Sequence, residues 1–346
     1  MIMGGDPDYS RWGVTTMPDD KSQSRRIYVG LQEGVCTVSG QGDTWISGHV
    51  TPLAHASARL SASPVVGGRA YLAAYEAGVY RTDDGGQTWK RLDAYPSPYA
   101  HSIAAHPSDG GTVYVGSEPA SLYNSSDGGE SWQECTGFTA VPESDQWGFH
   151  IETRKSHVRD LRVAPHDAGY LYAAIEEGGM VRSRDGGATW KQLPGIHDDV
   201  HCIALSRARP KSLYVATSRA PYRTDDEGDN WEVISDGMDG RYALHIAVAP
   251  DDADLVLLTA SGNSRRENPQ FYRSIDGGRS WKPITSAAKD GDMVVAFEWD
   301  LQSPGTVYAG TESGTIVRSQ DHGETWQQLP VNLPKLAVGA FAVTSV

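Results

Sequence analysis

A glutamate recurs just after short tyrosine-centred β-type runs, of which residues 27–30 and 113–116 are two examples. Carboxylates at matching positions in a ring of repeats would form an acidic collar around a central opening, suited to a divalent cation or a polyhydroxylated ligand. The alternative is that glutamate suits a solvated turn beside a glycine, because a residue shared by most repeats usually serves the repeat itself. The five glutamates are Glu33, Glu76, Glu118, Glu176 and Glu312.

The longest stretch between repeats, residues 135–156, carries aromatic side chains among many charged ones. Long connections with aromatic residues of their own are more often functional than short ones. Trp147 could stack on a sugar or anchor a lid, and His150 is a further ligand-binding candidate in the same stretch. Trp147 could equally pack over the edge of two neighbouring repeats.

Histidines and aspartates gather just before the β-type runs that begin the repeats. The spacing of His197 and His201 invites a metal interpretation, but outside a helix it does not place both imidazoles on one side. The sequence therefore predicts no resident metal or cofactor, and leaves only a divalent cation in a central channel as an option. We interpret the histidines as solvated or hydrogen-bonded, and keep His201 as a ligand-binding candidate. The set comprises His55, His101, His157, His197, Asp198, Asp199, His201, His245, Asp290 and Asp292.

Arg219 replaces the recurrent glutamate in one repeat, and the irregular stretch 261–270 of the next repeat adds Arg265, Arg266 and Glu267. Together these residues make a local basic region on an acidic protein. Arginine at such a place could meet a carboxylate of a ligand or of a protein partner.

All of these residues lie between copies of one nine-residue stretch, which reads RTDDGGQTW at 81–89. The pattern Ser/Thr-x-Asp-x-Gly-x-(Ser/Thr/Asn)-Trp, called the box below, occurs in full six times, and an eroded copy ends at Trp45. Short β-type runs flank each box, which predicts a hairpin turn held by the aspartate, with glycines at positive φ and a tryptophan to bury. The box is a structural element. Its aspartates are Asp84, Asp127, Asp185, Asp226, Asp276 and Asp321, and its tryptophans are Trp89, Trp132, Trp190, Trp231, Trp281 and Trp326.

Successive box tryptophans are 44, 43, 58, 41, 50 and 45 residues apart, counting from Trp45. That period is typical of a four-stranded propeller blade, so the whole chain is expected to form one all-β domain. A further run at 336–343 competes with 12–16 for the same place, and we expect it to pair with the first blade and close the ring. The expected blades are 12–46, 58–92, 101–134, 158–193, 200–234, 243–284 and 293–329.

The box resembles the Asp-box, or BNR, repeat of bacterial neuraminidases, reducing-end xyloglucanases, sortilin-type receptors and a photosystem assembly factor. The resemblance covers nearly the whole chain and implies a seven-bladed β-propeller of four-stranded antiparallel blades. It places the box on the turn between the third and fourth strands, away from the functional face. Proteins that share this repeat do unrelated things, so the resemblance implies a fold rather than a function.

Three functions fit the sequence. A non-catalytic propeller could present the face opposite the boxes to a glycan or a protein. A sialidase- or xyloglucanase-like glycoside hydrolase would instead need two carboxylates on that face, drawn from Asp198, Asp199, Asp290, Asp292 or the recurrent glutamates. The N-terminal Arg-Ile-Pro motif of neuraminidases is replaced here by Tyr9-Ser10-Arg11-Trp12. The third function is an assembly scaffold, so the sequence leaves open whether the protein is an enzyme.

The formal net charge of −14 disfavours nucleic acid and anionic membranes as partners, because both require basic surfaces. Cys36, Cys135 and Cys202 lack any metal-type spacing and are interpreted as reduced small hydrophobes. The first residues lack the apolar segment of a secretory signal, which predicts a cytoplasmic protein, although a processed secreted protein would look the same. We also expect the protein to be a monomer.

Overall fold

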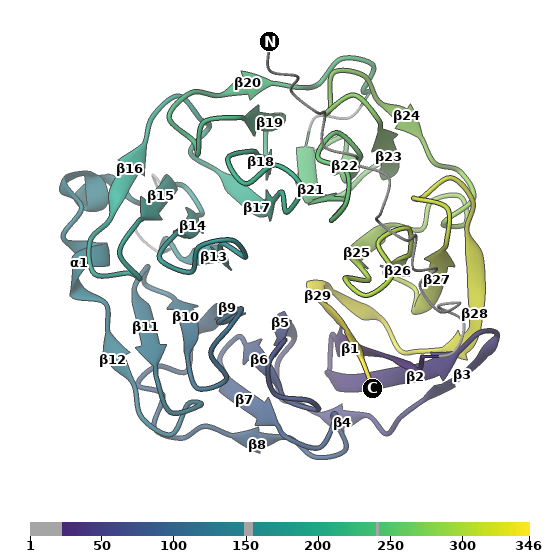
Figure 1. Cartoon of the computed structure of the whole chain (residues 1–346), viewed down its shortest axis with the longest axis horizontal. Helices are drawn as coiled ribbons and strands as arrows, with labels where there is room; N and C mark the ends of the chain where they lie inside the picture. The colour runs from purple at the N-terminus through teal and green to yellow at the C-terminus, as the bar shows by residue number, and fades with distance from the viewer. Residues whose placement is uncertain (1–22, 149–154, 240–241) are drawn as a thin grey trace, which may run out of the picture.

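The computed structural model describes residues 23–148, 155–239 and 242–346. Seven antiparallel sheets are arranged around a central axis like the blades of a propeller (Figure 1). Each blade contributes its innermost strand to the wall of the central channel, and successive strands lie progressively further out. The predicted all-β, seven-bladed propeller of four-stranded antiparallel blades is confirmed.

The strands follow the repeat order of the sequence. Blade 1 contains β29 (Leu336–Ser345), β1 (Arg25–Leu31), β2 (Gly34–Gln41) and β3 (Thr44–Ser47), with β4 (Thr51–Pro52) also paired to β2. Blades 2 and 3 contain β5 (Ser57–Ala62), β6 (Ala70–Ala74), β7 (Gly78–Thr82), β8 (Lys90–Arg91), β9 (Ala100–Ala105), β10 (Val113–Ser117), β11 (Leu122–Ser125) and β12 (Gln133–Glu134). Blades 4 and 5 contain β13 (Val158–Val163), β14 (Leu171–Ile175), β15 (Gly179–Ser183), β16 (Lys191–Leu193), β17 (Val200–Leu205), β18 (Leu213–Thr217), β19 (Pro221–Thr224) and β20 (Glu232–Val233). Blades 6 and 7 contain β21 (Tyr242–Val248), β22 (Val256–Ser261), β23 (Gln270–Ser274), β24 (Lys282–Pro283), β25 (Val294–Trp299), β26 (Val307–Thr311), β27 (Thr315–Ser319) and β28 (Gln327–Asn332).

The ring closes through blade 1. Strand β29 pairs antiparallel with β1, with Val29 opposite Phe341, and takes the innermost position of that blade. The run 12–16, which competed with it in the sequence, lies outside the described residues. A buried ion pair between Arg25 of β1 and Asp300, which directly follows β25 of blade 7, adds a second link across the closure. The two ends of the described chain therefore share one sheet.

Each full box is held by its aspartate and by the hydroxyl two residues before it. In blade 2, Asp84 accepts hydrogen bonds from the N–H of Thr88, four residues on, at 2.9 Å and from the Thr88 hydroxyl at 2.6 Å. Thr82 donates its hydroxyl to Asp84 and accepts the N–H of Gly86. Gly86 has φ +84°, and a Cβ there would lie 2.4 Å from Thr37 of blade 1, so the turn also packs tightly on its neighbour.

These hydrogen bonds predict an acid-dependent loss of stability. Burial opposes ionisation of Asp84, but hydrogen bonds from Thr88 and Thr82 outweigh it and lower the pKa to about 2. Hydrogen bonds from Asn230 and Thr224 likewise lower the pKa of Asp226 to about 2. A carboxylate with a lowered folded pKa stabilises the protein above the unfolded pKa of about 3.9, and that stability is lost as the pH falls through the folded value.

We therefore expect the thermal midpoint to fall steadily between about pH 4 and pH 2. Differential scanning calorimetry across that range measures it. The double variant Asp84→Asn, Asp226→Asn is the control, and its pH dependence should be shallower than that of the parent. A parent midpoint that stayed constant below pH 4 would contradict the role given to the box carboxylates.

The hydrophobic core is divided among the interfaces between blades. Each of seven buried clusters draws chiefly on two adjacent blades, such as Tyr71 and Leu92 of blade 2 with Ile103 and Val115 of blade 3. The alternation of inward and outward side chains in short strands gives each blade two apolar faces, one for each neighbour. Burial of those faces requires all the blades together.

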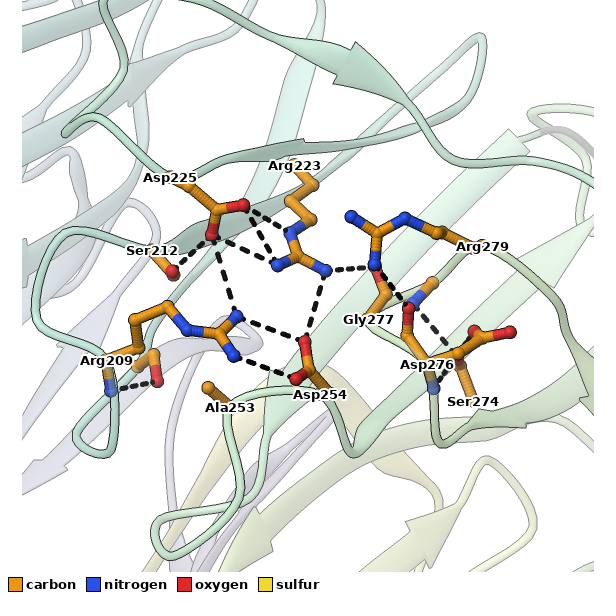
Figure 2. Close-up of polar contacts among 12 residues, drawn as sticks. Arg209, Ser212, Arg223, Asp225, Ala253, Asp254, Ser274, Asp276, Gly277 and Arg279 are labelled. Carbon is orange, nitrogen blue, oxygen red and sulfur yellow. Dashed lines mark hydrogen bonds and ion pairs between the residues drawn. The ribbon is translucent and has the colours of Figure 1, made fainter.

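An arginine three residues before the box aspartate links a blade to the next one. Figure 2 shows Arg223 of blade 5 between Asp225 of its own turn and Asp254 of blade 6, with an N–H on the Gly277 carbonyl at 3.3 Å. Equivalent bonds run from Arg81 to Gly128, Arg182 to Glu227, Arg273 to His322 and Arg318 to Gly42. Blade 3 has Asn124 at this place, and the Tyr114 hydroxyl donates to the Gly186 carbonyl of blade 4 instead.

The helical content is small. The structure has a four-residue helix α1 (Thr136–Thr139) and a 3-10 helix η2 (Pro142–Gln146), both in the long connection between blades 3 and 4. Within the described ranges, none of the helices has the length and apolarity needed to cross a membrane. Cys36 and Cys202 are buried, and burial raises the pKa of the Cys36 thiol to about 12.

Candidate functional site

The recurrent glutamates and the histidines that precede the innermost strands meet in pairs. Within a blade, the turn between the second and third strands and the segment leading into the innermost strand lie at the same end of the ring, opposite the boxes. We call this end the mouth face. On three consecutive blades a ring nitrogen lies 3.1–3.2 Å from a carboxylate oxygen. These pairs are His55–Glu76, His101–Glu118 and His157–Glu176, and we call them the histidine–glutamate arc.

Burial increases along the arc. The side chains of His55 and Glu76 are about two-fifths exposed, those of the blade 3 pair are 15% and 22% exposed, and those of His157 and Glu176 are about one-tenth exposed. The rings of His101 and His157 stack at 3.9 Å between centroids, which joins blades 3 and 4. A buried polar group that lacks a hydrogen bond destabilises the fold. Because the histidine and glutamate of each pair satisfy one another, the pairs stabilise the mouth face.

The charge states along the arc are set by burial and by neighbouring cations. Burial, together with the charges of His157 and Arg159, lowers the pKa of His101 to about 2, so this imidazole is neutral and its contact with Glu118 is a hydrogen bond. Burial opposes ionisation of Glu176, but the His157 hydrogen bond and the adjacent Arg159 outweigh it and hold its pKa well below the usual range. Glu176 is therefore an ionised carboxylate.

Blade 5 continues the arrangement with different residues. The Nε2 atom of His201 lies 3.1 Å from Asp199, and its Nδ1 atom lies 2.6 Å from the Ala243 carbonyl oxygen. Burial opposes ionisation of Asp199, but the His201 hydrogen bond lowers its pKa below the ordinary value. The ring of Tyr242 lies 4.8 Å from that of His201. His197, the other histidine of this stretch, faces Asp198 instead, so the two do not share a partner.

One carboxyl group beside the arc, that of Glu177, has a raised pKa rather than a lowered one. Burial, reinforced by the nearby charges of Asp199 and Asp198, raises the pKa of Glu177 above its ordinary value. Its backbone has φ +56°, in the left-handed region, where the turn after β14 places it. A carboxyl with a raised pKa near one with a lowered pKa is the environment from which acid and base roles are assigned in hydrolases.

Other predicted site residues lie outside the arc. Glu33 is exposed, and Glu312 lies 3.8 Å from Arg266. The Trp147 ring is half-buried, 5.1 Å from that of Phe138, and its indole N–H donates to Gln192. His150 lies outside the described residues.

Arg219 is exposed on the turn after β18, and its guanidinium has no hydrogen bond or ion pair with another described residue. Asp292, one of the aspartates before blade 7, accepts a hydrogen bond from the Ser313 hydroxyl beside Glu312. The basic region and the arc thus occupy different blades of the same face.

One part of the arc has the composition of a metal site. The nitrogen atoms of His101 and His157 and an oxygen of Glu118 all lie within 4.8 Å of one another. Sequence analysis named all three residues but not their convergence, because they come from two blades. The spacing of His197 and His201 had drawn attention to a different pair.

The opposite end of the central channel holds a cavity of about 320 Å³ that sequence analysis missed. Arg162, Arg207, His245 and Glu298 are among its lining residues. Next to it, the buried Asp160 lies 3.7 Å from Arg59 and 3.2 Å from Arg162, and accepts the Ile203 N–H at 2.8 Å. The only signal in the sequence was a charged residue inside a strand that the repeat places innermost.

The comparisons with known proteins agree with the geometry of the boxes. The BNR/Asp-box repeat family matches residues 80–91, and the family described as sortilin, neurotensin receptor 3, matches residues 178–300. The chain is a propeller that carries Asp-box repeats. The resemblance stated from the sequence is therefore confirmed, and the subfamily is left open by these matches.

Curated relatives of this Asp-box propeller include both enzymes and an assembly factor. A xyloglucanase of Acetivibrio thermocellus is 28% identical over 160 residues, which are 41% of this chain and 19% of the enzyme. The photosystem II assembly protein Ycf48 of a Synechococcus strain is 26% identical over 106 residues, which are 30% of this chain and 29% of that protein. The propeller thus spans less than a third of the length of either relative.

Solved structures share the fold at low identity. The GH74 xyloglucanase of Xanthomonas campestris superposes with a TM-score of 0.66 at 16% identity, covering 88% of this chain and 55% of that one. YCF48 bound to a D1 peptide superposes with a TM-score of 0.58 at 16% identity, covering 93% of this chain and 91% of that one. These likenesses concern the architecture of the Asp-box propeller.

Proposed function

We propose that this propeller is a binding protein whose mouth face holds a segment of a partner protein that carries a carboxylate. The observation that carries the proposal is the state of the mouth-face charges. Glu176 and Asp199 are each engaged by a histidine, and Glu176 also by Arg159, whereas Arg219 is exposed and makes no ion pair with another described residue. These two carboxylates each have a histidine partner, and the Arg219 guanidinium is left to meet a ligand.

The surroundings of Arg219 suit a peptide. The Ser218 N–H donates to the Asp199 carbonyl, which fixes the turn that carries the arginine. Arg266 on the next blade is two-fifths exposed and only 3.8 Å from Glu312, so it offers a second guanidinium. Arginine recognises carboxylates with two parallel hydrogen bonds, and loops held by a rigid scaffold are a common place for such recognition.

The similarity to YCF48 supports the same function. That protein is described as bound to a D1 peptide, and the match covers 93% of this chain and 91% of that one. The match to the GH74 enzyme covers only 55% of the enzyme's chain. The share of each relative that is matched therefore supports a binding propeller.

Peptide selection tests the proposal. A displayed library of random peptides is selected on the purified propeller, and the affinity of the selected peptides is measured by fluorescence anisotropy. We expect peptides rich in acidic residues, and roughly tenfold weaker binding to Arg219→Ala, because one charge-assisted hydrogen bond contributes that much. The matched control is Arg279→Ala, an exposed arginine on a box, which should bind as the parent does. Equal affinity for Arg219→Ala and the parent would overturn the assignment.

A second function has one specific observation in its favour. The opposite pKa shifts of Glu177 and Asp199 are those expected of the acid and base of a glycoside hydrolase. Release of reducing sugar from xyloglucan oligosaccharides measures this activity. Turnover that is abolished in both Glu177→Gln and Asp199→Asn, and retained in the exposed control Glu33→Gln, would replace the binding proposal with the enzymatic one.

A further inference from the structure

Three side chains of the histidine–glutamate arc converge at the junction of blades 3 and 4. His101 lies at the start of β9, Glu118 directly follows β10 of the same blade, and His157 directly precedes β13 of the next. An oxygen of Glu118 lies 3.1 Å from His101 Nε2 and 3.8 Å from His157 Nδ1. The two ring nitrogens and a Glu118 oxygen lie within 4.8 Å of one another, so a cation that replaced the hydrogen between His101 and Glu118 would meet all three.

The contacts of His157 determine which of its nitrogens can bind a ligand. Its Nε2 lies 3.1 Å from a Glu176 oxygen, which engages that nitrogen. Nδ1 is the nitrogen left for a ligand. His157 is 92% buried, with 8% exposed, and its Nδ1 has no hydrogen-bond partner in the part of the chain that the structure describes.

The nearest polar atom in the cluster to this nitrogen, an oxygen of Glu118, is 3.8 Å away, which is too far for a hydrogen bond. A buried polar atom without a partner is costly. A metal cation would bind both atoms at once.

We propose that His101, Glu118 and His157 bind a zinc-class divalent cation that joins blades 3 and 4 at the mouth face. Two imidazoles and one carboxylate are ligands typical of zinc, whereas calcium and magnesium prefer oxygen alone. At zinc bond lengths of about 2.0–2.1 Å, tetrahedral ligand atoms are roughly 3.3 Å apart. The Glu118 oxygen lies 3.1 and 3.8 Å from the two nitrogens and all three atoms lie within 4.8 Å of one another, so rotation of the stacked rings would bring them to a cation. The bond from His157 to Glu176 has the form of the carboxylate–histidine–zinc arrangement that orients a ligand.

The fourth position would be open. Glu118 is 22% exposed and His101 15%, so water or a ligand can approach the cation from the mouth. The site is independent of the peptide-binding function, because Arg219 lies on blade 5 and takes no part in it. Its failure would leave that function untouched.

Zinc binding is measured by isothermal titration of chelator-treated protein with zinc chloride, with absorption of the cobalt-substituted protein as a report on coordination. We expect one cation per chain, a higher thermal midpoint with zinc, and a cobalt spectrum of four-coordinate type. Glu118→Gln and His157→Gln should lose binding, while Glu176→Gln should bind roughly 10- to 100-fold more weakly, as is typical of a residue that orients a ligand.

The matched control is the pair on blade 2. His55→Ala removes a histidine with the same relation to a glutamate but in an exposed pair without a third ligand, so zinc affinity should not change. Saturation with zinc that is equally strong in His157→Gln and the parent would overturn the proposal. So would an absence of binding in the parent at millimolar zinc.

Discussion

Replacement of Asp160 by alanine is expected to lower the free energy of unfolding by about 3 kcal/mol, because it leaves the largely buried guanidinium of Arg59 and the partly buried one of Arg162 without this counter-charge. Asp160 is 2% exposed and lies between Arg59 and Arg162 in the channel. Removal of one partner of a buried pair costs about 3–5 kcal/mol, and the lower figure applies because Arg162 remains one-third exposed. The bond to the Ile203 N–H is lost as well. Urea denaturation of parent and variant at neutral pH measures the difference.

Glu298 provides a matched control in the same channel. Burial raises its pKa, in contrast to Asp160, where burial is outweighed by Arg162 and Arg59 and the pKa is lowered. A raised carboxyl pKa means that ionisation costs stability at neutral pH, so Glu298→Gln should leave the free energy of unfolding unchanged or increase it. The effect of Asp160→Ala should shrink as the pH falls below about 3.9, the unfolded pKa of aspartate. Equal losses in both variants would show that the channel does not distinguish the two carboxylates.

Deletion of residues 336–346 is expected to abolish the stable monomer. Strand β29 is the innermost strand of blade 1, and it buries Leu336 and Phe341 between blades 1 and 7. Two such side chains contribute about 1.5–3 kcal/mol each, which is a large part of the roughly 5–15 kcal/mol that stabilises a typical domain. The deletion also exposes the edge of β1, and an unpaired strand edge promotes association. Size-exclusion chromatography and thermal unfolding measure both effects.

A shorter deletion and a peptide separate the strand from the tail. Removal of Ser345 and Val346 alone, both exposed, should have little effect on the thermal midpoint. A synthetic peptide of residues 336–346 added to the longer deletion should restore the midpoint, because it can add back as a strand. If the truncated chain stayed monomeric and had the same thermal midpoint as the parent, β29 would not be needed for closure.

The fold could be predicted because its determinants are local. The hydrogen bonds of a box connect residues at most four apart, such as Asp84 and Thr88, so the pattern of one nine-residue stretch already specifies a turn. Six copies at a constant period then specify a ring. Closure was harder, because β29 and β1 lie at opposite ends of the chain, and the sequence could not indicate which end strand lies innermost.

The site was only partly predictable because its contacts are not local. His101 and Glu118 were both candidates, but they are 17 residues apart, and the antiparallel pairing of β9 with β10 brings them together. Arg81 stood within the quoted stretch, yet its partner Gly128 is 47 residues away on the next blade. Asp160 was missed because a single charge in an innermost strand has no signature until Arg59 and Arg162 are placed around it. His150 lies outside the described residues, so its candidacy stays a prediction.

The arginine links between boxes all run in one direction around the ring. Blades 5, 6 and 7 each donate to one neighbour and accept from the other, which is the relation of subunits in a heterologous, head-to-tail assembly. Such contacts do not limit the number of units, and only closure does, here through β29 and the bond from Arg318 to Gly42. A duplicated blade inserted between two others would meet a donor on one side and an acceptor on the other. The ring could therefore gain or lose blades during evolution while its seam stayed the same.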